Sequence, residues 1–238
     1  MNWREARATG RRRYVDKYDV TEADRYDTEP GHGLSTAEVD ACWSDLQRVI
    51  RLQQGEAVLD VGAGTGELCR VLSRATGVKL TALEPSAAML AKLPNKLPAV
   101  ACREGFTDGV TDRSHFGASE FDAIVSRQVV CGLFDPLQAF KNWHHWLKPG
   151  GLVVVIDGLF SREGWTDQWQ EEVDVLPLAS SQSRALTPYL LEAAGFEVQV
   201  VEWMSATNAM LREGGARRYV VVACKKAAPV AAAAGGGV

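Results

Sequence analysis

Hydrophobic and polar positions along the chain follow two alternating patterns, one with the period of a strand and one with the period of a helix. Short apolar runs predict strands near 57–61, 79–84, 98–102, 121–126 and 152–157. Helical spacing between these runs predicts helices near 66–76, 86–93 and 136–147. Strands that alternate with helices pair in parallel through right-handed crossovers, so the pattern predicts an α/β protein.

Each end of this alternating region has a pattern of its own. Ser35-Thr36-Ala37-Glu38 is a capping box, which predicts a helix that begins after Ser35 and continues until Gly55 ends it. The last two apolar runs, 196–204 and 217–224, have only 12 residues between them. This is too few for an ordinary crossover helix, so we expect an antiparallel hairpin.

Composition is typical of a single enzyme domain. The chain has 238 residues, of which 46% are hydrophobic and 24% charged. A chain of this length and hydrophobic content can bury a full core. The net charge of −4 gives no positive field that would attract a nucleic acid. No apolar run approaches the ~20 residues needed to span a bilayer, and the first residues lack the hydrophobic core of a signal peptide. We therefore expect a cytoplasmic protein without a membrane partner.

The cysteines and histidines predict neither a disulfide framework nor a metal site. Five cysteines, an odd number without a C-x-x-C pair, favour reduced and mostly buried thiols. The four histidines do not cluster with acidic residues at the spacing of metal ligands. His144 falls on the apolar side of its helix and His145 on the polar side, so we expect no metal here.

The stretch from Val58 to Leu68 joins an apolar strand to a glycine-rich turn and then to an amphipathic helix. Its three alternate glycines allow the backbone to turn sharply and to approach a ligand where a Cβ would clash. The pattern predicts a nucleotide cradle. A dinucleotide fingerprint G-x-G-x-x-G that began at Gly62 would need glycine at position 67, where the chain has Glu67.

Several landmarks together resemble the class I S-adenosylmethionine (SAM) dependent methyltransferases. Asp60-x-Gly62-x-Gly64-x-Gly66 is similar to motif I of that family. Glu84 follows 18 residues after Gly66, where a carboxylate is placed to accept from ribose hydroxyls. Parts of the family's fourth, fifth and sixth strand regions resemble residues 121–126, 147–157 and 190–196. The match covers roughly residues 56–224.

The resemblance implies a fold and a cofactor. The fold would be a Rossmann-like, doubly wound, seven-stranded sheet, mostly parallel with a C-terminal antiparallel hairpin, and the cofactor would be SAM. The glycine loop would pack against the methionine part of SAM, with Asp60 helping to hold its ammonium group and Glu84 binding both ribose hydroxyls. Since Phe106 stands where the family often has an acid for adenine, backbone amides and stacking would hold that base. The implied cofactor-binding residues are Asp60, Gly62, Ala63, Gly64, Gly66, Glu84, Pro85, Phe106, Thr107, Ser126 and Arg127.

Two segments fall outside the alternation of strands and helices. Residues 1–34 form a predicted N-terminal lid ahead of a SAM-dependent methyltransferase domain at 35–226, within which residues 158–186 are a predicted substrate insertion. Residues 227–238 are a low-complexity tail that we expect to be disordered. Arg11-Arg12-Arg13, in the lid, predicts a solvated face rather than a ligand clamp.

The ends of the fourth and fifth strands and the two outlying segments supply a predicted acceptor site. The candidate substrate residues are Tyr14, Tyr18, Cys131, Asp157, Phe160 and Trp165, and the candidate catalytic residues are His32 and Gln128. Ordinary packing explains each aromatic ring equally well. The Asn/Asp-Pro-Pro-Tyr motif of amide- and adenine-methylating relatives is absent, which disfavours nucleic-acid substrates. An aromatic pocket with a few polar anchors fits a small natural-product or quinone-like acceptor.

These features favour the transfer of a methyl group from SAM to an oxygen, nitrogen or carbon atom of a small molecule, by a monomer or homodimer. The sulfonium supplies the leaving-group chemistry, so the protein mainly aligns the reactants and excludes water. Phenols and carbon acids need a base, whereas a neutral amine does not. Two alternatives remain: a SAM- or nucleotide-binding protein without catalysis, and a nicotinamide-dependent oxidoreductase, which Glu67 disfavours.

Overall fold

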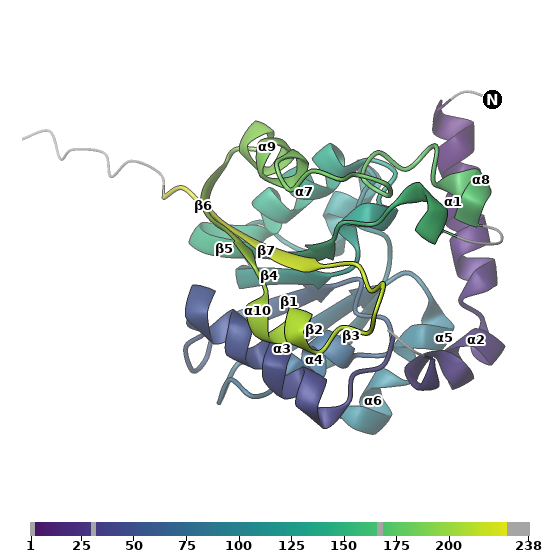
Figure 1. Cartoon of the computed structure of the whole chain (residues 1–238). Coiled ribbons are helices and arrows are strands. Elements are labelled where there is room, and N and C mark those ends of the chain that lie inside the picture. Colours follow the sequence, from purple (N-terminus) through teal and green to yellow (C-terminus); the bar gives the residue numbers. More distant parts are fainter. Residues whose placement is uncertain (1–2, 30–31, 166–168, 228–238) are drawn as a thin grey trace, which may run out of the picture.

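A single seven-stranded sheet organises the chain, in the order β3-β2-β1-β4-β5-β7-β6 (Figure 1). The computed structural model describes residues 3–29, 32–165 and 169–227. The strands are β1 (Ala57–Val61), β2 (Lys79–Glu84), β3 (Ala101–Glu104), β4 (Phe121–Arg127), β5 (Leu147–Gly158), β6 (Phe196–Trp203) and β7 (Arg218–Lys225). The five strands β1 to β5 pair in parallel, and β7 lies antiparallel between β5 and β6. The predicted fold class is confirmed.

Helices cover both faces of the sheet (Figure 1). One face carries α3 (Thr36–Val49), α4 (Glu67–Leu72) and α10 (Ser205–Ala209), and the other carries α7 (Pro136–Trp146) and α9 (Leu186–Ala193). The remaining helices are α1 (Trp3–Lys17), α2 (Val20–Arg25), α5 (Ala87–Leu90), α6 (Leu93–Lys96) and α8 (Trp169–Glu172). Short 3₁₀ turns are η1 (Tyr26–Thr28), η2 (Thr111–His115), η3 (Val130–Gly132) and η4 (Arg162–Gly164). The ribbon of α1 lies outside the two helical layers, beside α8.

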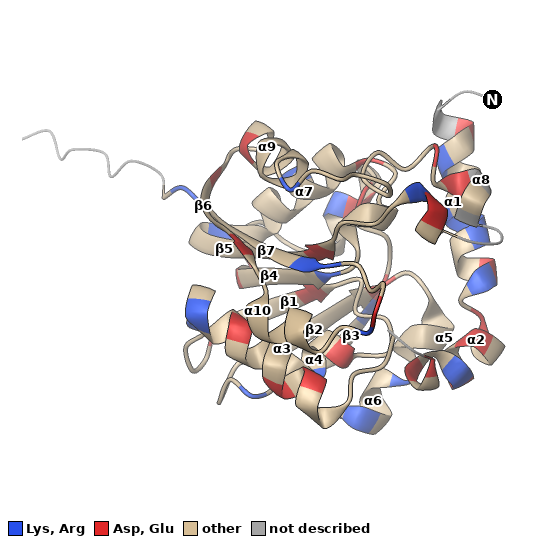
Figure 2. Ribbon diagram, viewed as in Figure 1, with Lys and Arg blue, Asp and Glu red and all other residues tan. Residues whose placement is uncertain are grey.

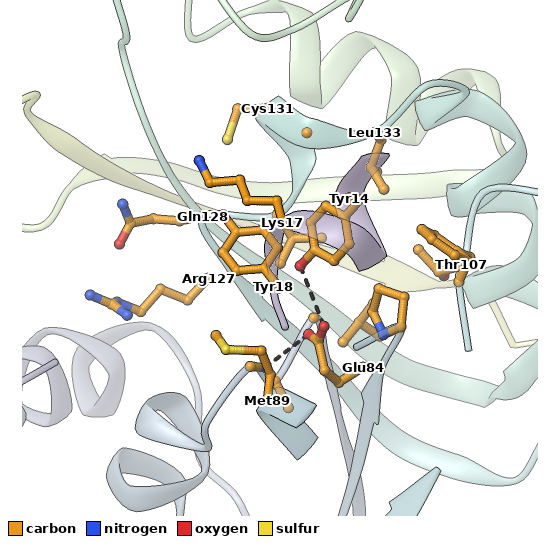
Figure 3. Close-up of a pocket in the computed structure, with 18 of the residues that line it drawn as sticks. Tyr14, Lys17, Tyr18, Glu84, Met89, Thr107, Arg127, Gln128, Cys131 and Leu133 are labelled. Carbon is orange, nitrogen blue, oxygen red and sulfur yellow. Dashed lines mark hydrogen bonds between the residues drawn. The ribbon is translucent and has the colours of Figure 1, made fainter. Parts of the chain in front are cut away.

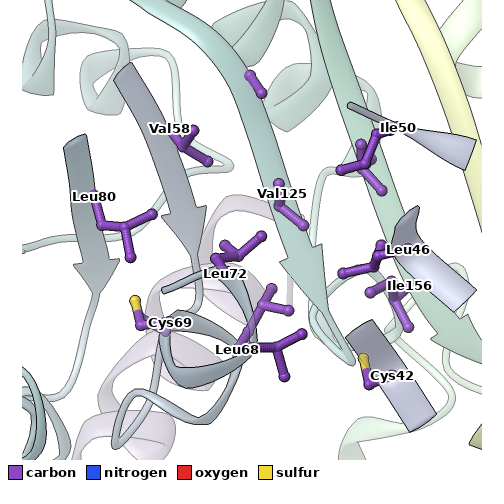
Figure 4. Packing of buried hydrophobic residues seen from close by; sticks show 14 of the residues in the cluster. Cys42, Leu46, Ile50, Val58, Leu68, Cys69, Leu72, Leu80, Val125 and Ile156 are labelled. Atoms are coloured by element: carbon purple, nitrogen blue, oxygen red, sulfur yellow. The ribbon is translucent and has the colours of Figure 1, made fainter. Parts of the chain in front are cut away.

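Buried hydrophobic residues fill the space between the sheet and each helical layer. On the side of α3 and α4, Leu46, Leu68 and Leu72 pack with Val58 and Val125 of the sheet (Figure 4). The opposite cluster contains the four largest fully buried aromatic side chains, Phe121, Phe140, Trp143 and Trp146. Each such side chain stabilises the fold by about 1.5–3 kcal/mol. The two clusters therefore fix the ends of the central strands, where the site is built.

Several predicted boundaries are wrong, each for a local reason. The capping box of Ser35 and Glu38 is confirmed, but α3 ends at Val49 because Ile50 turns to an extended backbone that places its side chain in the core. The third strand begins at Ala101 because a turn closed by the Val100 amide and the Leu97 carbonyl precedes it. The helix predicted at 86–93 is divided into α5 and α6, and the one predicted at 66–76 ends at position 72.

The outlying segments contain helices that the hydrophobic pattern did not predict. Residues 1–34 include α1 and α2, and residues 158–186 include η4 and α8. The predicted hairpin is present, and its connection contains α10. No helix in the described part of the chain is long and apolar enough to cross a membrane. Residues 228–238 of the predicted tail lie outside the described residues.

The turn between β1 and α4 depends on glycines with left-handed backbones. Gly62, Gly64 and Gly66 have φ angles of +69°, +54° and +97°. The amide of Gly62 donates to the carbonyl of Leu83 in β2 over 2.8 Å, which ties the turn to the neighbouring strand. A Cβ at position 62 would lie 2.3 Å from Cγ2 of Val129. Both backbone conformation and space therefore require glycine at position 62.

Replacing Gly62 with alanine should destabilise the protein more than the same change at Gly55. Gly55 also has a left-handed backbone, with φ +89°, but a Cβ there would meet nothing within 4 Å. We expect Gly55→Ala to lower the free energy of unfolding by about 1–2 kcal/mol through backbone strain. Gly62→Ala should lower it by a further 1–3 kcal/mol or so through overpacking. Urea unfolding measures both, and equal losses would contradict the role given to Val129.

Candidate functional site

A cavity of about 380 Å³ lies where the carboxyl ends of β1, β2 and β4 meet α1 (Figure 3). This volume is in the range of small-molecule sites, about 300–1,000 Å³. The position is also the one expected for a ligand, because the strand order reverses between β1 and β4. The cavity is therefore the strongest candidate for a functional site among the described residues.

Most of the site residues expected from the sequence line this cavity. From the cofactor set these are Gly62, Ala63, Gly64, Glu84, Pro85, Phe106, Thr107 and Arg127. From the acceptor set they are Tyr14, Tyr18, His32, Gln128, Cys131, Phe160 and Trp165. Four residues do not line it: Gly66, which is the N-cap of α4, and Asp60, Ser126 and Asp157, which are buried at strand ends.

Some lining residues were not identified from the sequence. Gly10 and Lys17 share one helical face with Tyr14, which was predicted, so this periodicity could have identified a site-facing side of α1. Leu133 and Leu176 reach the cavity from segments without a motif. Only the packing of those segments brings them to the site.

Glu84 ends β2 with its carboxylate inside the cavity (Figure 3). Its Oε2 accepts from the Gly64 amide at 3.0 Å, and its Oε1 accepts from the Ser86 amide at 2.9 Å and from the Tyr14 hydroxyl at 3.4 Å. Burial raises the pKa of Glu84 to about 7. Two backbone amides thus orient the carboxylate. The third donor is the Tyr14 hydroxyl, and the hydroxyl of a ribose could donate in its place.

Asp60 and Ser126 place unpartnered polar atoms at the ends of β1 and β4. Asp60 is 1% exposed, and its Oδ2 accepts from Cys69 Sγ at 3.1 Å. Its Oδ1 and the Ser126 hydroxyl are buried without a hydrogen-bond partner among the described residues. Burial raises the pKa of Asp60 to about 7. Buried acceptors of this kind suit a ligand with a cationic donor, so these residues fit the ammonium group of SAM.

The other side of the cavity is an aromatic wall after β3. The guanidinium of Arg11 lies 4.5 Å from the centre of the Phe106 ring, and the Tyr14 ring meets that ring edge-on at 6.0 Å. The Thr107 carbonyl accepts from Asn142 Nδ2 at 2.8 Å, and the Thr107 hydroxyl accepts from Trp143 Nε1. The core helix α7 therefore holds this wall in place.

Arg11 attaches α1 to the body of the protein, so the prediction of a solvated Arg11-Arg12-Arg13 face is wrong for this residue. It forms ion pairs with Asp108 and Asp112, and Asp108 also accepts from the Phe134 amide at 2.8 Å. Arg12 is exposed, as predicted. Charges of both signs occur along α1 (Figure 2), and it meets buried carboxylates on two sides: Arg11 pairs with Asp108, and Arg13 lies 3.9 Å from Glu172.

Three aromatic residues continue from α1 towards His32. The ring centres of Tyr14 and Tyr18 lie 4.6 Å apart, those of Tyr18 and Tyr26 lie 5.9 Å apart, and Tyr26 stacks on His32 at 4.2 Å. The Nδ1 atom of His32 lies 3.2 Å from Glu29 Oε2, without hydrogen-bond geometry. Burial lowers the pKa of His32, which favours the neutral imidazole that a proton acceptor needs.

Asp157 holds η3, part of which lines the cavity. Its carboxylate accepts from the Cys131 amide at 3.0 Å and from the Gly158 amide at 2.7 Å, so it holds η3 against the end of β5. Burial raises the pKa of the Cys131 thiol, which keeps that side chain protonated rather than nucleophilic. Within the described residues, no cluster of three histidine, cysteine or acidic side chains could hold a metal ion.

The sequence model of a family described as a methyltransferase domain matches residues 37–201. The chain belongs to this family. The resemblance to class I SAM-dependent methyltransferases is confirmed, and SAM is the family's cofactor. This membership leaves no support for the nicotinamide-dependent alternative.

The chain matches only part of the length of its curated relatives. The demethylmenaquinone methyltransferase of Chlorobaculum parvum is 31% identical over 105 residues, which cover 44% of this chain and 42% of the relative. Phosphoethanolamine N-methyltransferase 1 of Arabidopsis thaliana is 26% identical over 151 residues, which cover 62% of this chain and 30% of the relative. The chain thus spans less than half the length of either relative.

Solved structures share the fold at low sequence identity. A SAM-dependent methyltransferase from Aquifex aeolicus gives a TM-score of 0.62 at 20% identity, over 87% of this chain and 98% of that one. Phosphoethanolamine N-methyltransferase 2 of Haemonchus contortus, in complex with SAM, gives 0.65 at 16% identity, over 92% of this chain and 60% of that one.

Replacing Arg11 with glutamine should destabilise the methyltransferase domain, because it leaves the buried Asp108 carboxylate without its ion pair. Breaking a buried pair costs about 3–5 kcal/mol, and the partial exposure of Arg11 should bring the loss to about 2–3 kcal/mol. The neighbouring Arg12→Gln is the matched control and should change the free energy of unfolding by less than about 0.5 kcal/mol. Urea unfolding measures both variants. If they lost the same stability, α1 would not be anchored through Arg11.

Stability should fall as pH rises, in part through Asp60. A carboxyl whose pKa is raised in the folded state stabilises the protein below its ordinary pKa, and this contribution is lost as pH rises through about 7. Glu84, whose pKa is also about 7, acts in the same direction. Asp60→Asn should reduce the fall in unfolding free energy between pH 5 and 8 by roughly 1–3 kcal/mol. The exposed Asp40→Asn is the control for loss of one charge, and an unaltered slope in Asp60→Asn would contradict the effect of burial.

Proposed function

We propose that the protein transfers a methyl group from SAM to a small-molecule acceptor bound beneath α1. One observation carries this proposal: a single cavity connects the glycine loop and Glu84 with a chamber of aromatic and polar side chains. In-line transfer needs a cofactor and an acceptor held side by side in a closed space. A protein that only bound the cofactor would not need the second chamber.

The cofactor would lie along the ends of β1 and β2, and its sulfonium would supply the methyl group. Glu84 would accept from the ribose hydroxyls in the place of the Tyr14 hydroxyl. The glycine loop would pack against the methionine part. Asp60 does not line the cavity, so its unpartnered Oδ1 would help to hold the ammonium group through the loop. Phe106 and the backbone around Thr107 would hold the adenine.

The acceptor would be a planar or aromatic molecule. Tyr14 and Tyr18 line the chamber from α1, and Phe160 and Trp165 line it from the segment at 158–186. Aromatic side chains favour flat, apolar ligands. A quinone-like or phenolic acceptor is therefore our proposal, and the name of the Chlorobaculum relative supports the same class. Residues 1–34 and 158–186 form the two lids of this chamber.

His32 is the proposed base for acceptors that must lose a proton. Its imidazole is favoured in the neutral form, and it lines the cavity on the stacked ring of Tyr26. Gln128 lines the same chamber, but its amide is not basic, so its role is to orient the acceptor by hydrogen bonds. Desolvation by the rings removes water that would compete for the methyl group.

S-adenosylhomocysteine should bind and raise the melting temperature, because a ligand that binds only the folded state stabilises it by mass action. Glu84→Gln should weaken this binding by about 1.5–3 kcal/mol, the range for a hydrogen bond to a charged group. Glu104→Gln is the matched control: Glu104 is the register partner of Glu84 in β3 and is exposed. Calorimetric titration measures both affinities.

Two outcomes would contradict the proposal. If S-adenosylhomocysteine at millimolar concentration left the melting temperature unchanged, the cofactor site would be wrong. If it bound, but labelled SAM gave no methylated product with a panel of phenols, quinols and amines, the protein would be a cofactor-binding protein without this activity.

A further inference from the structure

The two ends of the cavity differ in polarity. One end contains the wall of Phe106, Thr107 and Leu133. At the other end, the head groups of Lys17, Gln128 and Arg127 extend to the same side, away from Thr107 and Leu133 (Figure 3). Lys17 comes from α1, and the other two follow one another at the end of β4. Two cationic side chains and an amide thus gather in the acceptor chamber.

Arg127 is partly buried and forms no ion pair with a described residue. In the described parts of the chain, no carboxylate lies within 4.0 Å of its guanidinium, and its side chain makes no hydrogen bond. Arg11 and Arg70 are also partly exposed and are paired, Arg11 with Asp108 and Arg70 with Glu67 at 2.6 Å. Arg218 has no ion pair within the described residues, but its guanidinium donates to the Ala216 carbonyl at 2.8 Å. Removing an unpaired charge from water is costly, so a guanidinium that lines a cavity favours an anionic ligand.

The backbone at this point is unusual. Gln128 has φ of +56°, which is uncommon for a residue other than glycine, and its amide donates to the Ile156 carbonyl of β5 at 2.8 Å. This hydrogen bond holds the left-handed conformation, which turns the chain away from β4. Both Arg127 and Gln128 reach the cavity as a result.

The acidic residues of the acceptor chamber do not neutralise this end. Glu22 pairs with Arg25, and Glu172 lies 3.9 Å from Arg13. Glu84 faces the cofactor end and accepts from backbone amides and Tyr14. Asp60 interacts electrostatically with Arg127, but no described carboxylate forms an ion pair with the guanidinium, so its N–H groups are left for a ligand.

We propose that the acceptor carries an oxyanion, a carboxylate or a phosphate, which the guanidinium of Arg127 binds beside Lys17 and the Gln128 amide. This inference rests on the proposed function and specifies its acceptor. A guanidinium suits the role because its planar fork binds carboxylate and phosphate oxygens in pairs. The aromatic part of the acceptor would lie against Tyr18. The Nζ atom of Lys17 lies 5.6 Å from the centre of that ring.

The test uses matched probes on the full chain saturated with S-adenosylhomocysteine. The probes are 4-hydroxybenzoate, its methyl ester and phenyl phosphate, titrated by calorimetry. We expect at least one anion to bind tenfold or more tightly than the ester, and the better anion identifies carboxylate or phosphate as the group. Arg127→Gln should abolish this preference, Arg127→Lys should retain part of it, and Arg51→Gln, an exposed arginine outside the cavity, should retain all of it.

The affinity for S-adenosylhomocysteine separates the outcomes. If Arg127→Gln lowered this affinity tenfold or more, Arg127 would hold the carboxylate of the cofactor and the inference would be overturned. Equal binding of acids and ester by the wild-type protein would also overturn it, without affecting the proposed function. Failure of the wild-type protein to bind S-adenosylhomocysteine would instead refute the proposed function.

Discussion

The hydrogen bonds around the Glu84 carboxylate are the constraint on which the site depends. They bring together the glycine loop through Gly64, the start of α5 through Ser86, and α1 through Tyr14. A buried carboxylate must be satisfied by donors, so each of these segments has a fixed position relative to the end of β2. The two hydrophobic clusters position the strands. The hydrogen bonds of this carboxylate then hold the glycine loop, α5 and α1 around the strand ends, which leaves the cavity between them.

The two sides of the cavity are held by different kinds of interaction. Hydrogen bonds from Asn142 and Trp143, on a helix packed into the core, hold the wall at Thr107. The side formed by α1 is held by the ion pairs of Arg11 and by the contact of Gly10 with Phe134, where a Cβ would come within 2.0 Å of the ring. One side therefore shares the stability of the whole domain, whereas the other depends on a few ion pairs and one close contact with an aromatic ring.

Most of the sheet and the cofactor end could be predicted from the sequence, because their signals are local. Gly62 lies in the glycine turn that follows β1, and Glu84 ends β2, so the short stretches around them are enough to find both. The pairing of Arg11 with Asp108 joins residues 97 positions apart in a packing arrangement that no local pattern encodes. The exposed β3 was misplaced for a related reason, since an edge strand has little hydrophobic pattern to mark where it begins.

The position of α1 has a consequence for how the protein could diverge. No described residue of α1 belongs to the three clusters of buried hydrophobic residues, although its side chains line the cavity. Most mutations that destabilise a protein strongly do so through its core. Substitutions at Lys17, unlike those at Gly10, can therefore change the lining of the cavity while the folding of the sheet stays intact. At such a position, selection can alter the cavity almost independently of stability, whereas Arg11 and Gly10 stay constrained by the contacts that hold the helix.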